Sequence, residues 1–223
     1  MLGYPARPVL PLPVALVLSA VGGLALWGAF PPVAAGWSAA AGVGAVTLAA
    51  WAAPVRRGLL LGLVAGLAFF GPLLEWMRII GPDAWAGLVL LCAAWLALGT
   101  AATAVVTRLP GGPVWAAATW TLVEALRGRV PFGGFPWGAL GFAQPDTVFG
   151  GWAPIGGIPV VTFVVALVGA SIARLVVLVA RREPAPWRRG APWVAGIVGV
   201  LVIAPIVAPI VRPAASGEAR IAI

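Results

Sequence analysis

The chain has 223 residues, of which 62% are hydrophobic and only 9% are charged, and its mean hydropathy is +1.06. Soluble domains carry about 25% charged residues, so this composition excludes an ordinary water-soluble globule and favours membrane-spanning helices of roughly 20 apolar residues each. The net charge of +8 comes from 14 arginines and no lysine, against six acidic residues. These arginines stand singly or in pairs between apolar runs, which is typical of membrane-topology signals and argues against nucleic-acid binding.

Seven apolar runs, separated by turns that contain proline, glycine or arginine, predict an all-α polytopic membrane protein with about seven transmembrane helices. The first run is longer than the 7–15 apolar residues of a signal-peptide core, so we interpret it as an uncleaved helix. The segment 181–189 between the last two runs is predicted to be a loop. The runs cover residues 9–27, 33–53, 58–80, 85–107, 114–127, 155–180 and 191–211.

The third run contains Gly62 and Gly66, a spacing that allows a second helix to approach closely. Because the chain contains 30 glycines, we attribute this spacing to chance.

The distribution of arginines favours a cytoplasmic N-terminus, because eight arginines then lie in cytoplasmic segments and five lie outside. Seven crossings place the C-terminus, and the segment between the fifth and sixth runs, on the extracytoplasmic side. The inner arginines are Arg7, Arg56, Arg57, Arg108, Arg181, Arg182, Arg188 and Arg189, and the outer ones are Arg78, Arg127, Arg129, Arg212 and Arg220, while Arg174 lies within the sixth run.

Few residues of the chain are suited to catalysis. Histidine is absent, which excludes histidine bases, histidine metal ligands and Ser-His-Asp triads. The single cysteine, Cys92, lies within an apolar run, where no base is available to activate a thiol, so we interpret it as a core residue. The acidic residues Asp83, Asp146, Glu183 and Glu218 are scattered in loops. We therefore expect no metal site and no cofactor.

Residues 124–157 form the segment where charge, aromatic residues, glycine and proline are concentrated. Its loop part carries five aromatic residues, Phe132, Phe135, Trp137, Phe142 and Phe149. Aromatic side chains favour the headgroup level of a bilayer, while glycine and proline permit tight turns. We predict that this loop lies in one membrane interface.

Glu124 and Arg127 lie three residues apart, and Glu75 and Arg78 repeat this spacing. Residues at this spacing share one helix face, and an ionised group costs roughly 2.5–3.5 kcal/mol at the bilayer centre. One interpretation is that each pair is a structural ion pair at a helix end. The other is that Arg127 or Arg129 binds the phosphate of an anionic phospholipid, which suits the planar guanidinium group.

The same segment carries the motifs of a known family. The motifs are Trp120, EALRG at 124–128, GFPW at 134–137, Gly141, Gln144 and APIGG at 153–157, with weaker matches at Phe30-Pro31 and Glu75-Trp76. In order and spacing they resemble bacterial apolipoprotein N-acyltransferases. Residues 220–223 resemble the opening of the first strand of that family's catalytic domain. The resemblance covers most of the chain, but only the membrane half of the enzyme.

The resemblance implies an enzyme of the bacterial plasma membrane that moves a phospholipid acyl chain, through a cysteine thioester, to the N-terminal amine of a diacylglyceryl-cysteine lipoprotein. It implies a transmembrane domain at residues 1–211 and the start of a truncated extracytoplasmic nitrilase-like domain at residues 212–223. That domain supplies the Glu-Lys-Cys triad of the family, so we expect this chain alone to be inactive. The lateral entrance for both lipids would be lined by Glu124, Arg127, Arg129, Phe135, Pro136 and Trp137.

Two alternatives remain open. In some actinobacterial relatives this membrane domain is associated with a polyprenol-phosphate mannose synthase, so the chain would be the membrane anchor or partner of such a glycosyltransferase. A small transporter is a further possibility, but the midplane polar sites and repeated halves that are typical of transporters are missing from this sequence.

Overall fold

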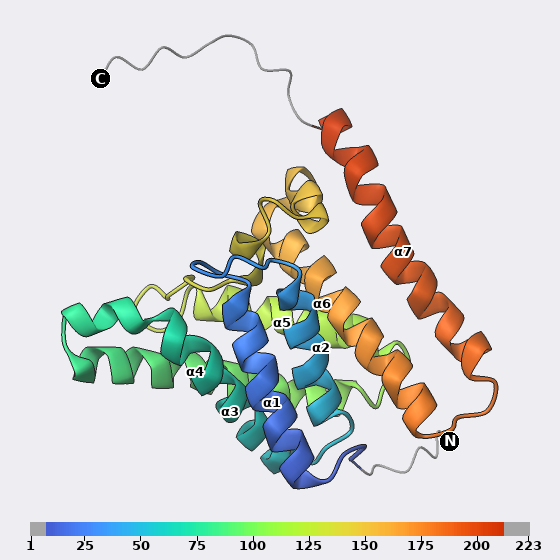
Figure 1. Cartoon of the computed structure of the whole chain (residues 1–223), viewed down its shortest axis with the longest axis horizontal. Helices are drawn as coiled ribbons and strands as arrows, with labels where there is room; N and C mark the ends of the chain where they lie inside the picture. Colours follow the sequence, from blue (N-terminus) through green and yellow to red (C-terminus); the bar gives the residue numbers. More distant parts are fainter. Residues whose placement is uncertain (1–7, 212–223) are drawn as a thin grey trace.

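The structure is a computed structural model that describes residues 8–211 (Figure 1). Every regular element in this range is a helix, so the predicted all-α fold is confirmed for these residues. The proposed start of a second domain at 212–223, together with Arg7, Arg212, Glu218 and Arg220, lies outside the described residues. The α-helices are α1 (Leu12–Gly28), α2 (Ser38–Ala50), α3 (Val55–Leu73), α4 (Pro82–Val106), α5 (Gly112–Arg127), α6 (Ala153–Ala180) and α7 (Pro186–Val211), and the 3-10 helices are η1 (Glu75–Ile79), η2 (Leu140–Ala143) and η3 (Val148–Trp152).

Three segments are long and apolar enough to cross a bilayer, namely Val55–Leu73, Pro82–Val106 and Val148–Ala180. The helices α1 and α2 are apolar but have only 17 and 13 residues. A helix rises 1.5 Å per residue, so roughly 20 residues are needed to span the hydrocarbon core. A crossing by all seven helices therefore remains a prediction.

Prolines mark the beginnings of two helices where the sequence predicted turns or loops. Pro82 opens α4 and Pro186 opens α7, and both occupy the first helical turn, where the missing N–H of proline costs nothing. The predicted loop at 181–189 is therefore wrong in its second half, because Trp187 and the two following arginines are already helical.

The helices α3 and α4 approach closely along a row of small residues. A Cβ atom added to Gly62 would lie 2.6 Å from the Cα of Ala97, and one added to Gly66 would lie 2.6 Å from the Cα of Ala93. Gly58 faces Ala101 in the same way. The attribution of the glycine spacing to chance is therefore wrong, because no larger side chain fits in this contact.

The helix α6 is interrupted near its beginning. Gly157 has a φ angle of +67°, a left-handed conformation that glycine adopts at little cost, and Pro159 follows it. The turn at residues 153–155 is thereby set off from the long apolar part of α6.

The connections alternate between two ends of the helix bundle. The "loop end" holds residues 128–152 between α5 and α6, and the "turn end" holds residues 181–185 between α6 and α7. Figure 1 shows α3 and α4 as a hairpin that projects to the left, and α7 as a separate rod beside α6 on the right. Helix α5 packs between α4 and α6, which places its C-terminal residues under the loop.

Candidate functional site

Glu124 lies in the last turn of α5 and accepts hydrogen bonds from three directions. Its Oε1 accepts from the indole N–H of Trp120 at 3.1 Å and from the backbone N–H of Leu140 at 3.0 Å. Its Oε2 accepts from the hydroxyl of Thr162 at 2.8 Å. One carboxylate therefore joins α5 to the loop and to α6.

Arg127, one turn further along α5, holds a different part of the loop. Only 4% of the residue is exposed, and its Nη1 donates to the backbone carbonyls of Phe135 at 2.6 Å and Trp137 at 2.7 Å. Its guanidinium group lies 5.1 Å from the centre of the Phe70 ring in α3. Hydrogen bonds from a charged donor are stronger than those between neutral groups, so Arg127 fixes the path of this part of the loop.

These two charged residues have separate partners. Within residues 8–211, no ion pair joins Glu124 to Arg127 or to any other arginine. Each side chain is hydrogen-bonded by neutral groups of the protein instead. The two side chains therefore hold different parts of the loop, and Glu124 also holds α6.

The other pair predicted from the sequence lies in η1. Glu75 and Arg78 are 2.9 Å apart, and both side chains are more than half exposed. Arg78 also lies over the ring of Trp85, at 4.2 Å from its centre. The pair does not contact Glu124 or Arg127, but the neighbouring Trp76 lies 6.0 Å from the ring of Trp137 in the loop. The tip of the α3–α4 hairpin is thus next to the loop.

The loop aromatics divide into an outer and an inner set. Phe132 is fully exposed, and Trp137 and Phe142 are about half exposed, whereas Phe149 is buried and Phe135 is half-buried. Pro136, between Phe135 and Trp137, is exposed. The outer set is placed to contact lipid or a partner, while the inner set supports the loop.

Gly134 allows the sharp turn at the top of this loop. Its φ angle is +82°, and an added Cβ would collide with the backbone of Gly128 and Arg129. Only glycine combines this conformation with such a close approach.

Two pockets flank α5 at the loop end. The pocket on the α4 side, of about 190 Å³, lies between Leu91 and Trp95 of α4 and Phe132 and Phe135 of the loop, and Arg127 forms its inner wall. Its other lining residues, which include Cys92, are uncharged. This pocket therefore presents a single cation among mostly apolar residues.

The pocket on the α6 side is larger, at about 380 Å³. Its lining includes Glu124 and Thr162, together with Arg129, Phe142 and Ile158. Arg129 is exposed and donates from Nη1 to the carbonyl of Ala125 at 2.7 Å. A narrow cleft lined by Cys92, Trp120 and both charged residues shares Arg127 with the first pocket and Glu124 with the second.

The sequence interpretation missed the role of several polar residues. Gln144 is fully buried, and its Nε2 donates to the carbonyl of Gly36 at 3.1 Å, while its Oε1 accepts from the hydroxyl of Thr147 at 2.8 Å. It thereby attaches the loop to the α1–α2 connection. Thr162 is a polar residue within an apolar run, and this feature of the sequence could have indicated its contact with Glu124.

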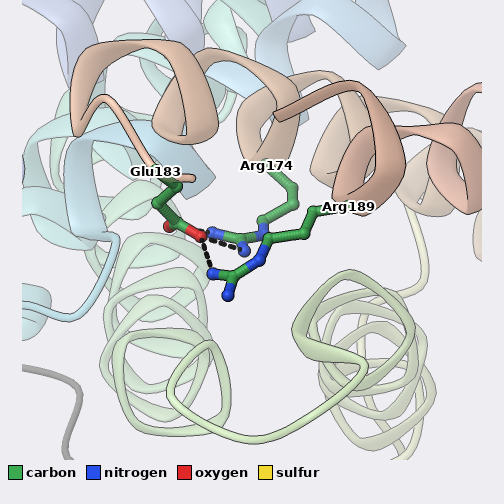
Figure 2. A network of polar contacts seen from close by, with 3 residues as sticks. All are labelled: Arg174, Glu183 and Arg189. Atoms are coloured by element: carbon green, nitrogen blue, oxygen red, sulfur yellow. Dashed lines mark hydrogen bonds and ion pairs between the residues drawn. The ribbon is translucent and has the colours of Figure 1, made fainter. Parts of the chain in front are cut away.

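Glu183 was also missed, although it is the most ion-paired carboxylate among the described residues. Figure 2 shows it at the turn end, with Arg174 and Arg189 directed at its carboxylate. Arg174 makes two contacts, at 2.8 and 2.9 Å, and Arg189 makes one at 3.0 Å. Within residues 8–211, no group of three or more histidine, cysteine or acidic side chains is placed to hold a metal ion.

The chain is similar to proteins of one family. The profile of the apolipoprotein N-acyltransferase N-terminal domain matches residues 22–171, which include the whole loop and α5 but end before Arg174 and Glu183. A relative from Mycolicibacterium smegmatis, named apolipoprotein N-acyltransferase, is 35% identical over 160 residues, or 69% of this chain and 26% of the relative. Relatives of the same name from Chromobacterium violaceum and Pseudomonas syringae pv. tomato are 39% identical over 134 residues and 30% identical over 161 residues. These two alignments cover 54% and 64% of this chain, and 26% and 31% of the respective relatives. The chain thus spans between a quarter and a third of the length of these curated relatives.

Proposed function

Because this chain belongs to the apolipoprotein N-acyltransferase family, we propose that it is the membrane domain of an enzyme that acylates lipoproteins. The enzyme would take an acyl chain from a phospholipid and transfer it to the N-terminal amine of a diacylglyceryl-cysteine lipoprotein. The observation that carries the proposal is the match over residues 22–171, which contains the charged and aromatic site at the loop end. The chain would provide the membrane seat and the lateral entrance for both substrates.

The entrance would be formed by the residues that the loop end gathers around α5. Arg127 is the one charged residue that lines the pocket on the α4 side, and this arrangement suits the phosphate and the acyl chains of a phospholipid donor. Exposed aromatic residues at the mouth suit the headgroup level of the membrane. The proposed entrance residues are Glu124, Arg127, Arg129, Phe135, Pro136 and Trp137.

The proposed orientation in the plasma membrane has seven crossings, a cytoplasmic N-terminus and an extracytoplasmic C-terminus. The excess of arginines in the segments assigned to the cytoplasm supports this orientation. Single cysteines placed at Phe132 and at Trp187 in a Cys92→Ala background would test it. A membrane-impermeant thiol reagent added to intact cells should label the first and not the second, and the reverse pattern would overturn the orientation.

The function is tested in the native host, with the gene product at its natural length. Deletion of the gene should leave lipoproteins with a free N-terminal amine and two acyl chains, and the restored gene should return the third chain. Mass spectrometry of lipoprotein N-terminal peptides measures both forms. Lipoproteins that keep a full third chain in the deletion strain would contradict the proposal, provided that the host has no second acyltransferase gene.

The domain organisation is a separate proposal, with a membrane domain at residues 1–211 and a nitrilase-like domain that begins at residues 212–223. An immunoblot of native membranes with an antibody against residues 181–189 measures the size of the product. A band well above 22.6 kDa supports a following catalytic domain, whereas a band at 22.6 kDa contradicts it. Purified 223-residue chain should not acylate a lipopeptide, and turnover by this chain would overturn the expected inactivity.

A further inference from the structure

The pocket on the α6 side of α5 differs from the pocket on the α4 side in the charge of its inner surface. Glu124 lines this pocket together with Pro136, Phe142 and Ile158. Pro136, Phe142 and Arg129 are exposed, so the pocket is accessible from outside. It therefore offers a carboxyl group among mostly apolar residues, together with an exposed arginine.

The Glu124 carboxylate has unused capacity for one further donor. A carboxylate provides about four lone-pair positions, and the donors on Trp120, Leu140 and Thr162 use three of them, two on Oε1 and one on Oε2. The open position is on Oε2, beside the Thr162 hydroxyl. All three present donors are neutral, and within residues 8–211 no ion pair neutralises this carboxylate.

A cationic ligand fits this arrangement better than an anionic one. An ionised carboxylate in an apolar surrounding is costly, and a paired cation reduces that cost. An anion in the same pocket would be repelled by Glu124. A compact primary ammonium group can donate to Oε2, whereas the exposed N–H groups of Arg129 suit peptide carbonyl oxygens that follow an N-terminus.

We propose that this pocket binds the N-terminal ammonium group of the lipopeptide acceptor, with Glu124 as its direct partner and Arg129 beside the first peptide carbonyls. This inference rests on the proposed function, because of the two proposed substrates only the acceptor must present a primary amine. The apolar walls suit the thioether-linked lipid next to that amine. Donor and acceptor would then occupy opposite sides of α5, with Arg127 and Glu124 as their respective partners.

Binding of two synthetic lipopeptides to the wild-type chain in nanodiscs tests the inference without any mutation. One lipopeptide carries a free N-terminal amine and the other is N-acetylated, and both have the same diacylglyceryl-cysteine and peptide. The nanodiscs contain phosphatidylcholine only, so that no lipid amine competes. The free amine should bind about tenfold more tightly or better, which corresponds to roughly 1.4 kcal/mol. Equal dissociation constants for the two lipopeptides would overturn the inference.

Two variants test whether the preference for the free-amine lipopeptide arises in this pocket. Glu124→Gln preserves the shape of the side chain but removes its charge, and it should reduce the preference for the free amine to about twofold or less. Glu75→Gln, which changes the exposed carboxylate of η1 at the same end of the bundle, should leave the preference unchanged. A preference that survives in Glu124→Gln, or that is lost in Glu75→Gln, would contradict a site at Glu124.

The outcomes separate this inference from the proposed function. If neither lipopeptide binds, the entrance role of the chain fails together with the ammonium site. If both bind equally, lipopeptide entry stands and only the ammonium site is wrong. An ethanolamine phospholipid that displaces the free-amine lipopeptide at equal concentration would reassign the pocket to a phospholipid headgroup and overturn the inference.

Discussion

Two carboxylates at opposite ends of the helix bundle differ in their hydrogen-bond donors, which are charged at one end and neutral at the other. Glu183 at the turn end is 8% exposed and is shared by two arginines, one of which contacts both of its oxygens (Figure 2). Glu124 at the loop end accepts three hydrogen bonds, all from neutral donors. Arg127 beside it likewise donates to backbone carbonyls.

We interpret this difference as that between an ionic lock and the proposed ligand site. At the turn end, Glu183 is ion-paired with two arginines, one in α6 and one in α7, and thereby links these two helices. At the loop end, the hydrogen bonds fix the loop, and no ion pair within residues 8–211 joins Glu124 or Arg127 to another side chain. The two residues line one narrow cleft together and one larger pocket each. We therefore expect substitutions at the turn end to reduce stability, and those at the loop end to reduce function more than stability.

The largest effect on stability is expected for Glu183→Ala. It leaves Arg174, with 15% of its side chain exposed, beside Arg189 without the shared carboxylate. Removal of one member of a buried ionic network costs about 3–5 kcal/mol, and we expect the lower value because Arg189 is 45% exposed. Thermal unfolding in nanodiscs measures the loss. The control Arg188→Ala, which changes an exposed neighbour, should have little effect, and an equal effect of both would contradict a lock at Glu183.

Two arginines that make similar backbone contacts at opposite ends of the bundle test the difference between these ends most directly. Arg127 and Arg108 each donate to two backbone carbonyls, and those of Arg108 belong to Ala52 and Ala53 at the opposite end. Either substitution by alanine leaves carbonyls unsatisfied and should cost about 1–3 kcal/mol. Only Arg127→Ala displaces the proposed entrance, so it alone should lower lipoprotein N-acylation, by roughly 10- to 100-fold.

The ratio of triacylated to diacylated lipoprotein in the native host, divided by the amount of folded protein, measures this effect. If Arg108→Ala lowers the normalised ratio as much as Arg127→Ala does, the loss follows from folding, and the two ends are not functionally different.

The helices were largely predictable from the sequence, because long apolar runs have few alternatives in a membrane. Their ends were less predictable, since Pro82 and Pro186 are compatible with either a turn or a helix start. Only the packing of the adjacent residues decides between the two. The Gly62–Gly66 spacing was undervalued for a similar reason. The two glycines pack against the row of alanines in α4, and the sequence alone does not indicate which helix will contact them.

The residues of the site were predictable individually, but their partners were not. The helical spacing placed Glu124 and Arg127 on one face and suggested that they pair with each other. Their actual partners are backbone groups of the loop and the hydroxyl of Thr162 on another helix, and these groups are brought near by the loop path. Glu183 was missed because Arg174, one of its partners, lies nine positions away on the preceding helix.

A smaller effect is expected for the exposed aromatic residues of the two ends. Trp137 at the loop end lies 6.0 Å from the Trp76 ring, and such a pair contributes about 0.5–1.5 kcal/mol. Trp137→Ala should therefore cost about 1 kcal/mol of stability and lower N-acylation severalfold. Trp187→Ala, which removes an exposed tryptophan at the turn end, should leave N-acylation unchanged in the same mass-spectrometric measurement. Equal losses from both variants would show that membrane anchoring alone sets the activity.

The smallest effect is expected for Arg78→Ala, although Arg78 lies at the loop end. Its ion pair with Glu75 is more than half exposed, so we expect a cost below about 1 kcal/mol, even with the contact to the Trp85 ring. The cost should diminish further at about 1 M salt, where charges are screened within roughly 3 Å. N-acylation should remain near the wild-type level, because this arginine holds no part of the loop between α5 and α6. If Arg78→Ala instead reduced acylation as strongly as Arg127→Ala, acylation would depend on positive charge near the loop end. It would then not depend on the attachment of the loop by Arg127.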